Sequence, residues 1–293
     1  MRILLIGGSG LVGSHILAEG RSRNHEVTAT RRHFAVPGLI PLDLADTQAT
    51  RQLLADAKPD WVVHAAGWTW VDGCEQDPER CARENCGQPT ELARLCQQQG
   101  CRLAYISTTY VFDGKAGPYS ETDQPNPLNA YARSKWQAEQ NIQELFSGRA
   151  LIPRIICAWG REAQQKNFVY QTVKALREGR TLRLPSDQIG NPTWAGDVAW
   201  WLLGLMELGE SGVWNLAGDQ ENCDRVAWFC AIRDAARARG LVPAGTAPGY
   251  EAVPTVEFKQ PALRPLQAGA RIQRILDRLP RGPRSPADLA GIF

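Results

Sequence analysis

Histidine and methionine are scarce in this sequence, and its cysteines do not form the close pairs that hold metals. The chain of 293 residues has 4 histidines, 2 methionines and 8 cysteines, and it contains no C-x-x-C pair. Zinc sites usually combine tight pairs of cysteine or histidine ligands, so we predict no metal site. Reduced thiols that pack as small core residues explain the cysteines better and suit a cytoplasmic protein.

Long apolar runs and strong net charge are also missing. The longest apolar stretch, Val198–Met206, is too short to cross a bilayer and predicts a buried helix. Glycines interrupt the apolar N-terminal run too early for a signal peptide. A net charge of +2 without a basic stripe does not favour nucleic acid or an anionic membrane as partner. We therefore expect a small-molecule ligand and a location in the cytoplasm.

Apolar, strand-like runs alternate with helix-like segments through the first half of the chain. The strand-like runs are residues 2–7, 25–31, 39–44, 61–67, 102–108 and 150–156. The helix-like segments between them are residues 11–22, 47–56, 78–99 and 129–140. This alternation is typical of βαβ units, and it predicts an α/β fold of the Rossmann type with a doubly wound parallel sheet.

A glycine-rich turn separates the first strand from the first helix. The segment "IGGSGLVGS" places Gly7, Gly10 and Gly13 at three-residue spacing. Glycine permits a tight turn and a close approach to a pyrophosphate, and the helix N-terminus offers free N–H groups and partial positive charge. The turn predicts a dinucleotide site in which Leu11 and Val12 join the three glycines.

The end of the second predicted strand indicates which dinucleotide binds. An NAD site usually has an acidic residue there, but "TATRRH" supplies Arg31 and Arg32. Guanidinium groups favour a 2′-phosphate, so we expect NADP(H) in preference to NAD(H). The alternative is that both arginines are simply solvated on the surface.

Strand-like and helix-like segments no longer alternate regularly after about residue 160. Proline-rich, polar stretches at 184–197 and 242–265 predict loops. We expect an NADP-binding Rossmann domain at 1–160 and a smaller, mainly substrate-binding domain at 161–293. Some segments of this second part are expected to return to the main sheet.

The segment "NAYARSKWQAEQ" places Tyr131 and Lys135 one turn apart on one helix face. An ammonium group beside a tyrosine stabilises the phenolate and lowers the pKa of the phenol. The segment "AYISTTYVFDG" adds hydroxyl groups at the end of the fifth strand, where open α/β sheets bind ligands. Together these residues predict a proton-transfer site.

These motifs resemble those of the extended short-chain dehydrogenases/reductases. Within that superfamily the chain is similar to the dTDP-4-dehydrorhamnose reductase family over nearly its whole length. The segments that carry the resemblance are "GGSGLVG", "HAAGWTWVDGCE", "STTYVFDG", "GPYSETDQPNPLNAYARSK", "GNPTWAGDVA", "GVWNLAG" and "ALRPLQAG". The resemblance implies hydride transfer from NADPH to a ketone of a nucleotide-activated 4-keto-6-deoxy sugar.

The resemblance also implies roles for individual residues. Thr108 would be the hydroxyl of a catalytic triad, Tyr131 its acid and Lys135 the partner of the tyrosine. Asp43 and Leu44 would lie by the adenine. Further residues would line the cofactor path (Ala65, Ala66, Gly67) or face the substrate (Thr69, Val71, Thr108, Thr109, Cys157, Asn191, Pro192, Thr193).

Three positions depart from the family pattern. Thr109 replaces an aspartate, and Cys157 stands where a tryptophan often faces the substrate. Both changes leave the identity of the sugar open. His15 replaces a glutamate that some members use in a magnesium-bridged dimer, which argues against that assembly. The oligomeric state stays open, with a homodimer among the choices.

Two other functions compete with the reductase. A sugar-nucleotide epimerase or dehydratase would recycle a tightly held NAD, and Arg31 and Arg32 count against it. A non-catalytic regulatory subunit, resembling methionine adenosyltransferase beta, would keep the fold and the cofactor pocket. The intact Thr108, Tyr131 and Lys135 favour catalysis over this second alternative.

Overall fold

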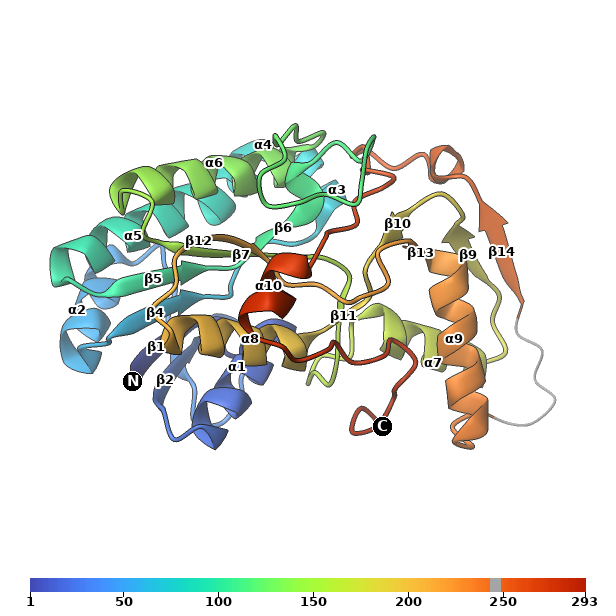
Figure 1. Ribbon diagram of the computed structural model, residues 1–293, viewed down its shortest axis with the longest axis horizontal. Helices are drawn as coiled ribbons and strands as arrows, with labels where there is room; N and C mark the ends of the chain where they lie inside the picture. The colour runs from blue at the N-terminus through green and yellow to red at the C-terminus, as the bar shows by residue number, and fades with distance from the viewer. Residues whose placement is uncertain (243–248) are drawn as a thin grey trace.

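A parallel β-sheet forms the centre of the larger part of the molecule in the computed structural model, which describes residues 1–242 and 249–293 (Figure 1). Its eight strands include the path β12-β7-β5-β4-β1-β2-β3, and β6 pairs with β7. The strands are β1 Arg2–Ile6, β2 Glu26–Arg31, β3 Ile40–Pro41, β4 Trp61–His64, β5 Arg102–Tyr105, β6 Ser107–Thr108, β7 Leu151–Ile155 and β12 Gly212–Asn215. This order confirms the predicted Rossmann-type α/β fold.

Helices cover both faces of the sheet. On one face lie α2 (Thr47–Ala57), α5 (Gln88–Gln99) and α6 (Ala130–Leu145), and on the other lie α1 (Leu11–Ser22) and α8 (Ala195–Glu207) (Figure 1). The strand β1 shows why both faces need cover. Ile3 and Leu5 pack into the core of the α1 and α8 face, whereas Leu4 and Ile6 pack into the opposite core. Alternate side chains of a strand point to opposite faces, so this apolar run is buried on both.

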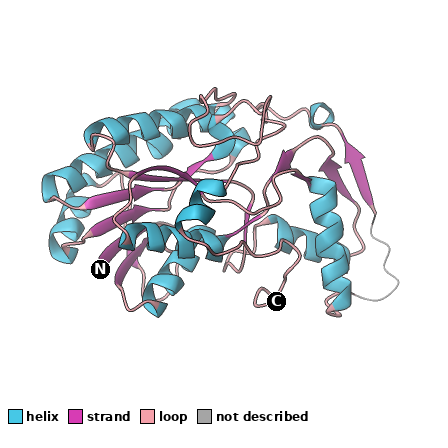
Figure 2. Cartoon of the chain, in the orientation of Figure 1, coloured by secondary structure: helices cyan, strands magenta, loops and turns pink. Residues whose placement is uncertain are grey.

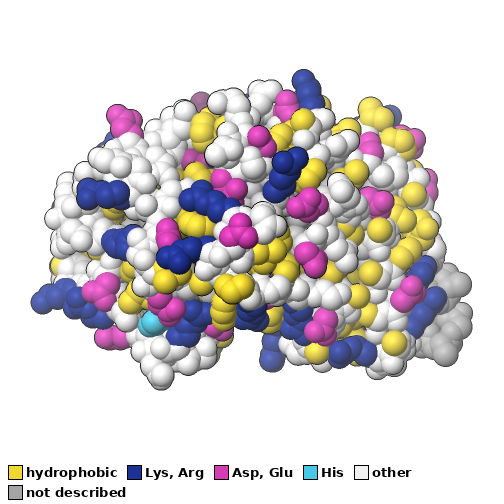
Figure 3. All heavy atoms as spheres, in the orientation of Figure 1, with side chains coloured by type: hydrophobic (Ala, Val, Ile, Leu, Met, Phe, Trp, Pro, Cys, Tyr) yellow, Lys and Arg dark blue, Asp and Glu magenta, His cyan; other side chains and the backbone are white. Residues whose placement is uncertain are grey.

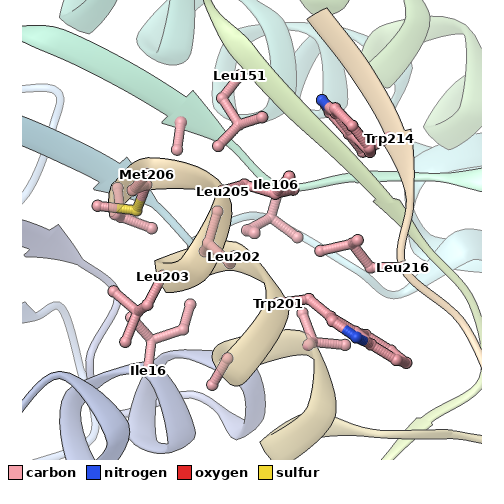
Figure 4. Close-up of a cluster of buried hydrophobic side chains, with 14 of the residues drawn as sticks. Ile16, Ile106, Leu151, Trp201, Leu202, Leu203, Leu205, Met206, Trp214 and Leu216 are labelled. Atoms are coloured by element: carbon pink, nitrogen blue, oxygen red, sulfur yellow. The ribbon is translucent and has the colours of Figure 1, made fainter. Parts of the chain in front are cut away.

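The apolar segment that predicted a buried helix is α8, and the structure confirms it. Leu202, Leu203 and Met206 of this helix lie among the buried side chains that include Ile16 of α1 and Leu151 of β7 (Figure 4). Fully burying such an aliphatic side chain contributes about 1.5–3 kcal/mol. The chain thus returns from its second half to complete the N-terminal sheet, first with α8 and then with β12.

The third strand is much shorter than the sequence predicted. Residues 39–44 were expected to be extended, but pairing with β2 covers only Ile40 and Pro41. Pro41 has no N–H to donate to a neighbouring strand. Two residues later the carboxylate of Asp43 accepts a hydrogen bond from the Ala45 N–H at 3.0 Å, which turns the chain towards α2. Local turn chemistry therefore overrides the apolar pattern here.

The predicted helix 78–99 and strand 102–108 are each divided. The helical region consists of α4 (Pro78–Ala82), a π-helical turn at Arg83–Gly87 and α5, and the short α3 (Val71–Gln76) precedes it. The strand breaks at Ile106 into β5, which pairs with β4 and β7, and β6, which pairs with β7. The helix predicted at 129–140 extends to Leu145.

The C-terminal region forms a smaller lobe with its own core, in which loops are prominent (Figure 2). Its helices are α7 (Phe168–Arg177) and α9 (Arg225–Ala238), whereas α10 (Gln273–Arg278) packs against β12 and the core of the main sheet. Its strands form three pairs: β9 (Leu182–Pro185) with β14 (Tyr250–Val253), β10 (Ile189–Gly190) with β13 (Cys223–Asp224), and β8 (Ala158–Trp159) with β11 (Thr193–Trp194). The strands β10, β11 and β14 fall in stretches predicted as loops, β9 overlaps the first of these stretches, and residues 243–248 of the second lie outside the described part.

Charges of both signs are interspersed on the molecular face shown in Figure 3. In the part of the chain that the structure describes, every helix falls short of the length and apolar character needed to cross a membrane.

Candidate active site

Tyr131 and Lys135 lie in the first two turns of α6, and the residue before this helix fixes where it begins. The side-chain oxygen of Asn129 accepts a hydrogen bond from the Ala132 N–H at 2.8 Å, as expected of an N-cap. The amide nitrogen of the same side chain donates to the Leu263 carbonyl at 2.7 Å. The start of α6 is therefore held both by its own sequence and by the C-terminal lobe.

The structure brings Thr108 and Tyr131 together at the end of β6. The Thr108 hydroxyl lies close enough to the phenol to lower its pKa, and its Oγ1 accepts a hydrogen bond from the Tyr110 N–H at 3.2 Å. The rings of Tyr110 and Tyr131 pack edge to face, with centroids 6.3 Å apart. Burial raises the pKa of Tyr131 far above its ordinary value, and the Thr108 hydroxyl opposes that rise only in part. The phenol therefore keeps its proton at neutral pH and can donate it.

The ammonium group of Lys135 contacts other groups than the spacing between Tyr131 and Lys135 suggested. Its Nζ donates to the Ile106 carbonyl at 2.7 Å and lies 3.9 Å from the ring centroid of Tyr105. Burial lowers the pKa of Lys135 to about 7, although the carboxylate of Glu139 opposes the shift. The expectation that the lysine lowers the pKa of Tyr131 is not met, because burial of the phenol dominates.

The glycine turn has the shape that a pyrophosphate requires. Gly7 has φ +90°, and a Cβ at Gly13 would lie 2.1 Å from the Gly7 carbonyl oxygen, so neither position accepts a side chain. Gly10 is the N-cap of α1 and offers no side chain to bond the first amides of the helix. Those amides of Leu11 and Val12 are placed to bind an anion, so the turn fits the dinucleotide predicted for it.

Arg31 ends β2, and Arg32 follows it beside the helical region of the next βαβ unit. Arg32 forms an ion pair with Glu84 at 3.0 Å, and Glu84 also pairs with Arg80 at 2.8 Å. Among the described residues Arg31 has no ion-pair partner. Asp43 is exposed in the turn before α2, and the neighbouring Leu44 packs against the α2 and α5 core.

The predicted cofactor path follows β4 as a short extended segment. Ala65 continues the pairing of β4, since its N–H donates to the Ile6 carbonyl at 2.9 Å. Ala66 and Gly67 follow at the same edge of the sheet, and Gly67 has φ +159°. Thr69 is exposed and Val71 begins α3, so both lie beyond the end of the strand that leads to the site.

His64, the last residue of β4, is buried, and both of its ring nitrogens lack hydrogen-bond partners within residues 1–242 and 249–293. Burial lowers its pKa to about 3, and the positive charge of Lys135 adds to that effect. A neutral ring enclosed in this way packs as part of the wall of the site. His15 donates its Nε2 hydrogen to the Arg161 carbonyl at 3.1 Å. No group of three or more possible metal ligands occurs among the residues described.

A pocket lies next to this site, between the sheet and the C-terminal lobe. Its lining includes Cys157, which has φ +48°, and Pro192. Asn191 and Thr193, on either side of Pro192, direct their polar atoms into the protein. The Asn191 side chain bonds the backbone of Gly218 and Ala270, and the Thr193 hydroxyl donates to the Asn191 carbonyl at 2.8 Å. Their geometry fits a scaffold for the pocket wall better than direct contact with a ligand.

Thr109 is fully buried, and its hydroxyl has no hydrogen-bond partner in the described structure.

Several residues that line the pocket were not predicted from the sequence. The lining contributed by the C-terminal lobe and by the turn after β6 includes Tyr110, Gln188, Cys223, Arg225 and Trp228. Tyr110 lies within the quoted "STTYVFDG" motif, so its place in the sequence was a usable signal. The others follow no motif.

Comparison with known proteins identifies the family. A family profile described as the RmlD substrate binding domain matches residues 1–281. The chain belongs to the RmlD family. Its members include NAD(P)-dependent reductases of the extended short-chain dehydrogenase/reductase type, and this RmlD-family chain is an oxidoreductase of that type.

Two curated relatives bear on the function of this RmlD-family chain. It is 31% identical over 265 residues to dTDP-4-keto-6-deoxy-D-glucose reductase of Streptomyces niveus, an alignment that covers 90% of this chain and 86% of the relative. It is 30% identical over 241 residues to methionine adenosyltransferase 2 subunit beta of Rattus norvegicus, with 80% and 72% covered.

Solved structures of RmlD-family proteins share the fold. A hypothetical dTDP-4-dehydrorhamnose reductase from Sulfolobus tokodaii matches with a TM-score of 0.83 and 28% identity over 95% of both chains. The dTDP-4-dehydrorhamnose reductase of Bacillus anthracis in complex with NADP matches with a TM-score of 0.85 over 98% of this chain and 96% of that one, at 23% identity.

Proposed function

We propose that this protein is an NADPH-dependent reductase of a nucleotide-activated 4-keto-6-deoxy sugar. The observation that carries the proposal is the meeting of Thr108 and Tyr131 at the carboxyl end of the sheet, on the chain of an RmlD-family member. Ligands of open α/β sheets bind at this edge. A protonated phenol and a hydroxyl there suit the reduction of a ketone.

In the proposed mechanism the two hydroxyl groups act on one substrate oxygen. NADPH supplies the hydride when it is bound. Tyr131 donates its proton to the alkoxide that forms, and an alkoxide is basic enough to take it even though the pKa of Tyr131 is raised. Thr108 donates a hydrogen bond to the same oxygen and stabilises its developing charge. In the same proposal the ammonium of Lys135, held by the Ile106 carbonyl, binds the cofactor.

The chain's own residues support NADP(H) as the cofactor. The turn that contains Gly7, Gly10 and Gly13 fits the pyrophosphate, with the amides of Leu11 and Val12 directed at it. Arg31 and Arg32 supply guanidinium groups for a 2′-phosphate. In the same proposal Asp43 and Leu44 lie at the adenine, and the segment of Ala65, Ala66 and Gly67 follows the cofactor towards Tyr131 and Lys135. The substrate would contact Thr69, Val71, Thr108, Thr109 and Cys157, with Asn191 and Thr193 as the wall behind it.

The test is the oxidation of NADPH, followed by absorbance, with dTDP-4-keto-6-deoxyglucose and a panel of related ketosugar nucleotides. Tyr131→Phe should reduce kcat by about 10²–10⁴-fold, the usual contribution of a positioned acid, while NADPH binding stays unchanged. Tyr170→Phe is the matched control, because Tyr170 is a buried tyrosine of α7 whose hydroxyl bonds the Ile292 carbonyl far from this site. Equal activity of the parent and Tyr131→Phe would refute the mechanism.

The likeness to methionine adenosyltransferase 2 subunit beta supports one competing function, that of a regulatory subunit. In that case the parent protein would bind NADPH tightly, turn over none of the ketosugars, and co-purify with a stoichiometric partner. An epimerase or dehydratase would instead purify with bound NAD. An assay of the purified protein for bound nucleotide, made before substrate is added, together with the turnover assay distinguishes these three functions.

A further inference from the structure

The pocket beside Tyr131 contains a guanidinium group to which the described chain supplies no hydrogen-bond or ion-pair acceptor. Arg225 is the first residue of α9 and lines the pocket together with Tyr110, Cys157 and Gln188. It forms no ion pair or hydrogen bond within residues 1–242 and 249–293. An arginine presents five N–H donors in a rigid fork, and a partly buried arginine without an acceptor is unusual unless a ligand supplies one.

Aromatic rings hold Arg225 in place. Its guanidinium carbon lies 5.3 Å from the ring centroid of Phe168 and 5.3 Å from that of Trp228. The two rings themselves are in contact, with centroids 4.8 Å apart. Stacking on two aromatic faces orients the guanidinium group before any ligand arrives, which reduces the entropy lost on binding.

The other charged groups near the pocket already have partners within the protein. Arg264 acts on the pKa of Tyr110, but it forms an ion pair with Asp72 at 2.9 Å, and both side chains are largely buried. Asp224 lies next to Arg225 in sequence, but its carboxylate caps α9 by accepting from the Ala227 N–H at 2.7 Å. Among the described residues of the pocket lining, Arg225 is therefore the charged group whose side chain has no acceptor, and its positive charge favours an anionic ligand.

We propose that Arg225 binds the diphosphate group of the substrate, and this assignment rests on the proposed function. Tyr110 links the two ends of the substrate site, because it packs against Tyr131 and also lines the pocket that contains Arg225. In a hexose the carbon that carries the ketone, C4, lies across the ring from C1, which carries the diphosphate. A sugar with C4 at Tyr131 therefore directs its phosphates away from the phenol, into the pocket. Arginine forks match phosphate oxygens in bidentate geometry.

The test measures binding without turnover. Calorimetry at saturating NADPH, which occupies the glycine turn, would give the Kd of dTDP, UDP and inorganic pyrophosphate for the parent and for Arg225→Met. We expect the parent to bind at least the nucleoside diphosphates, and Arg225→Met to weaken that binding about 10- to 100-fold, as charge-assisted hydrogen bonds are lost. Arg225→Lys should retain part of the affinity, since the charge remains but the fork does not.

Arg233→Met is the matched control, because Arg233 lies on the same helix and pairs with Asp234 at 2.8 Å. It should leave every Kd unchanged. Unchanged diphosphate binding in Arg225→Met, equal weakening in the control, or no diphosphate binding by the parent would each overturn the proposal.

The outcome for Arg225 is separable from the outcome for the reductase. Turnover of a ketosugar with the same kcat/KM in Arg225→Met and parent would refute the diphosphate site and leave the reductase intact. Diphosphate binding that depends on Arg225, in a protein that turns over no ketosugar, would support the site and refute the reaction.

Discussion

Arg154 and Glu139 form a bidentate ion pair in the interior of the molecule, behind the catalytic residues. Arg154 Nη2 lies 2.7 Å from Glu139 Oε2, and the two side chains are only 2% and 1% exposed. The Ser107 hydroxyl donates to the same carboxylate. The carboxylate thus joins β6 and β7 to α6, one helical turn beyond Lys135.

Breaking this pair should destabilise the fold. Glu139→Leu or Arg154→Met would each leave one buried charge uncompensated, and we expect each to lower the free energy of unfolding by about 3–5 kcal/mol. The double variant should lose less than the sum of the two, because it buries no lone charge. Urea unfolding, followed by fluorescence, measures all three. A loss below about 1 kcal/mol in both single variants would contradict this account.

The activity should fall as the pH rises through the pKa of Lys135. Burial places that pKa at about 7, so the ammonium is present below this pH and is lost above it. We expect kcat/KM for NADPH, which reports the free enzyme, to decline above about pH 7. Lys135→Arg should abolish the decline, since a guanidinium does not titrate in this range. Glu139→Gln should move it to lower pH, because the carboxylate of Glu139 raises the lysine's pKa. If kcat/KM of Lys135→Arg declined over the same pH range, the decline would belong to another titrating group.

Arg32 should contribute to the choice between NADPH and NADH. Arg32→Met removes a guanidinium that would bind the 2′-phosphate, and we expect the Kd of NADPH to rise about 10- to 100-fold while that of NADH stays the same. Fluorescence of the bound reduced cofactor gives both constants. Arg51→Met is a suitable control, because Arg51 bonds Gln98 on the surface between α2 and α5. An equal loss of affinity for NADPH and NADH would show that Arg32 does not bind the 2′-phosphate.

Two glycines of the turn between β1 and α1 should differ in the effect of substitution by alanine. A Cβ at Gly13 would clash with the Gly7 carbonyl at 2.1 Å, so Gly13→Ala should reduce the stability of the protein as well as cofactor binding. Gly10 has φ −82°, and a Cβ there would make only an ordinary contact at 3.5 Å. Gly10→Ala should therefore fold normally and lose NADPH affinity, since the added methyl group lies where the pyrophosphate approaches. Thermal unfolding and NADPH titration of both variants test the contrast.

Much of this architecture could be predicted from short-range patterns. The alternation of apolar runs and helices predicted the parallel sheet, and the apolar stretch around Trp201 predicted a buried helix. Tyr131 and Lys135 share a helix face because their spacing requires it. These features depend on backbone periodicity, which the sequence carries locally.

The rest depended on contacts between distant segments. The ammonium of Lys135 lies against the Ile106 carbonyl because of how α6 packs on the end of β5, and spacing along one helix cannot show that. Arg225 lies 94 positions after Tyr131 and belongs to no recognised motif, so only the folded chain brings it to the pocket. Asn191 and Thr193 were predicted from a motif, but the direction of their polar atoms is decided by the backbone of Gly218 and Ala270.

The hydrogen bond from Asn129 to the Leu263 carbonyl has a consequence for exchanging parts between relatives. The residue that begins the catalytic helix is held by backbone contributed 134 positions later. A chimaera that joins the cofactor half of this protein to the C-terminal half of a relative would thus replace one of the two supports of that helix. Under the proposed function, an exchange that changes the substrate preference would therefore also change the positioning of Tyr131.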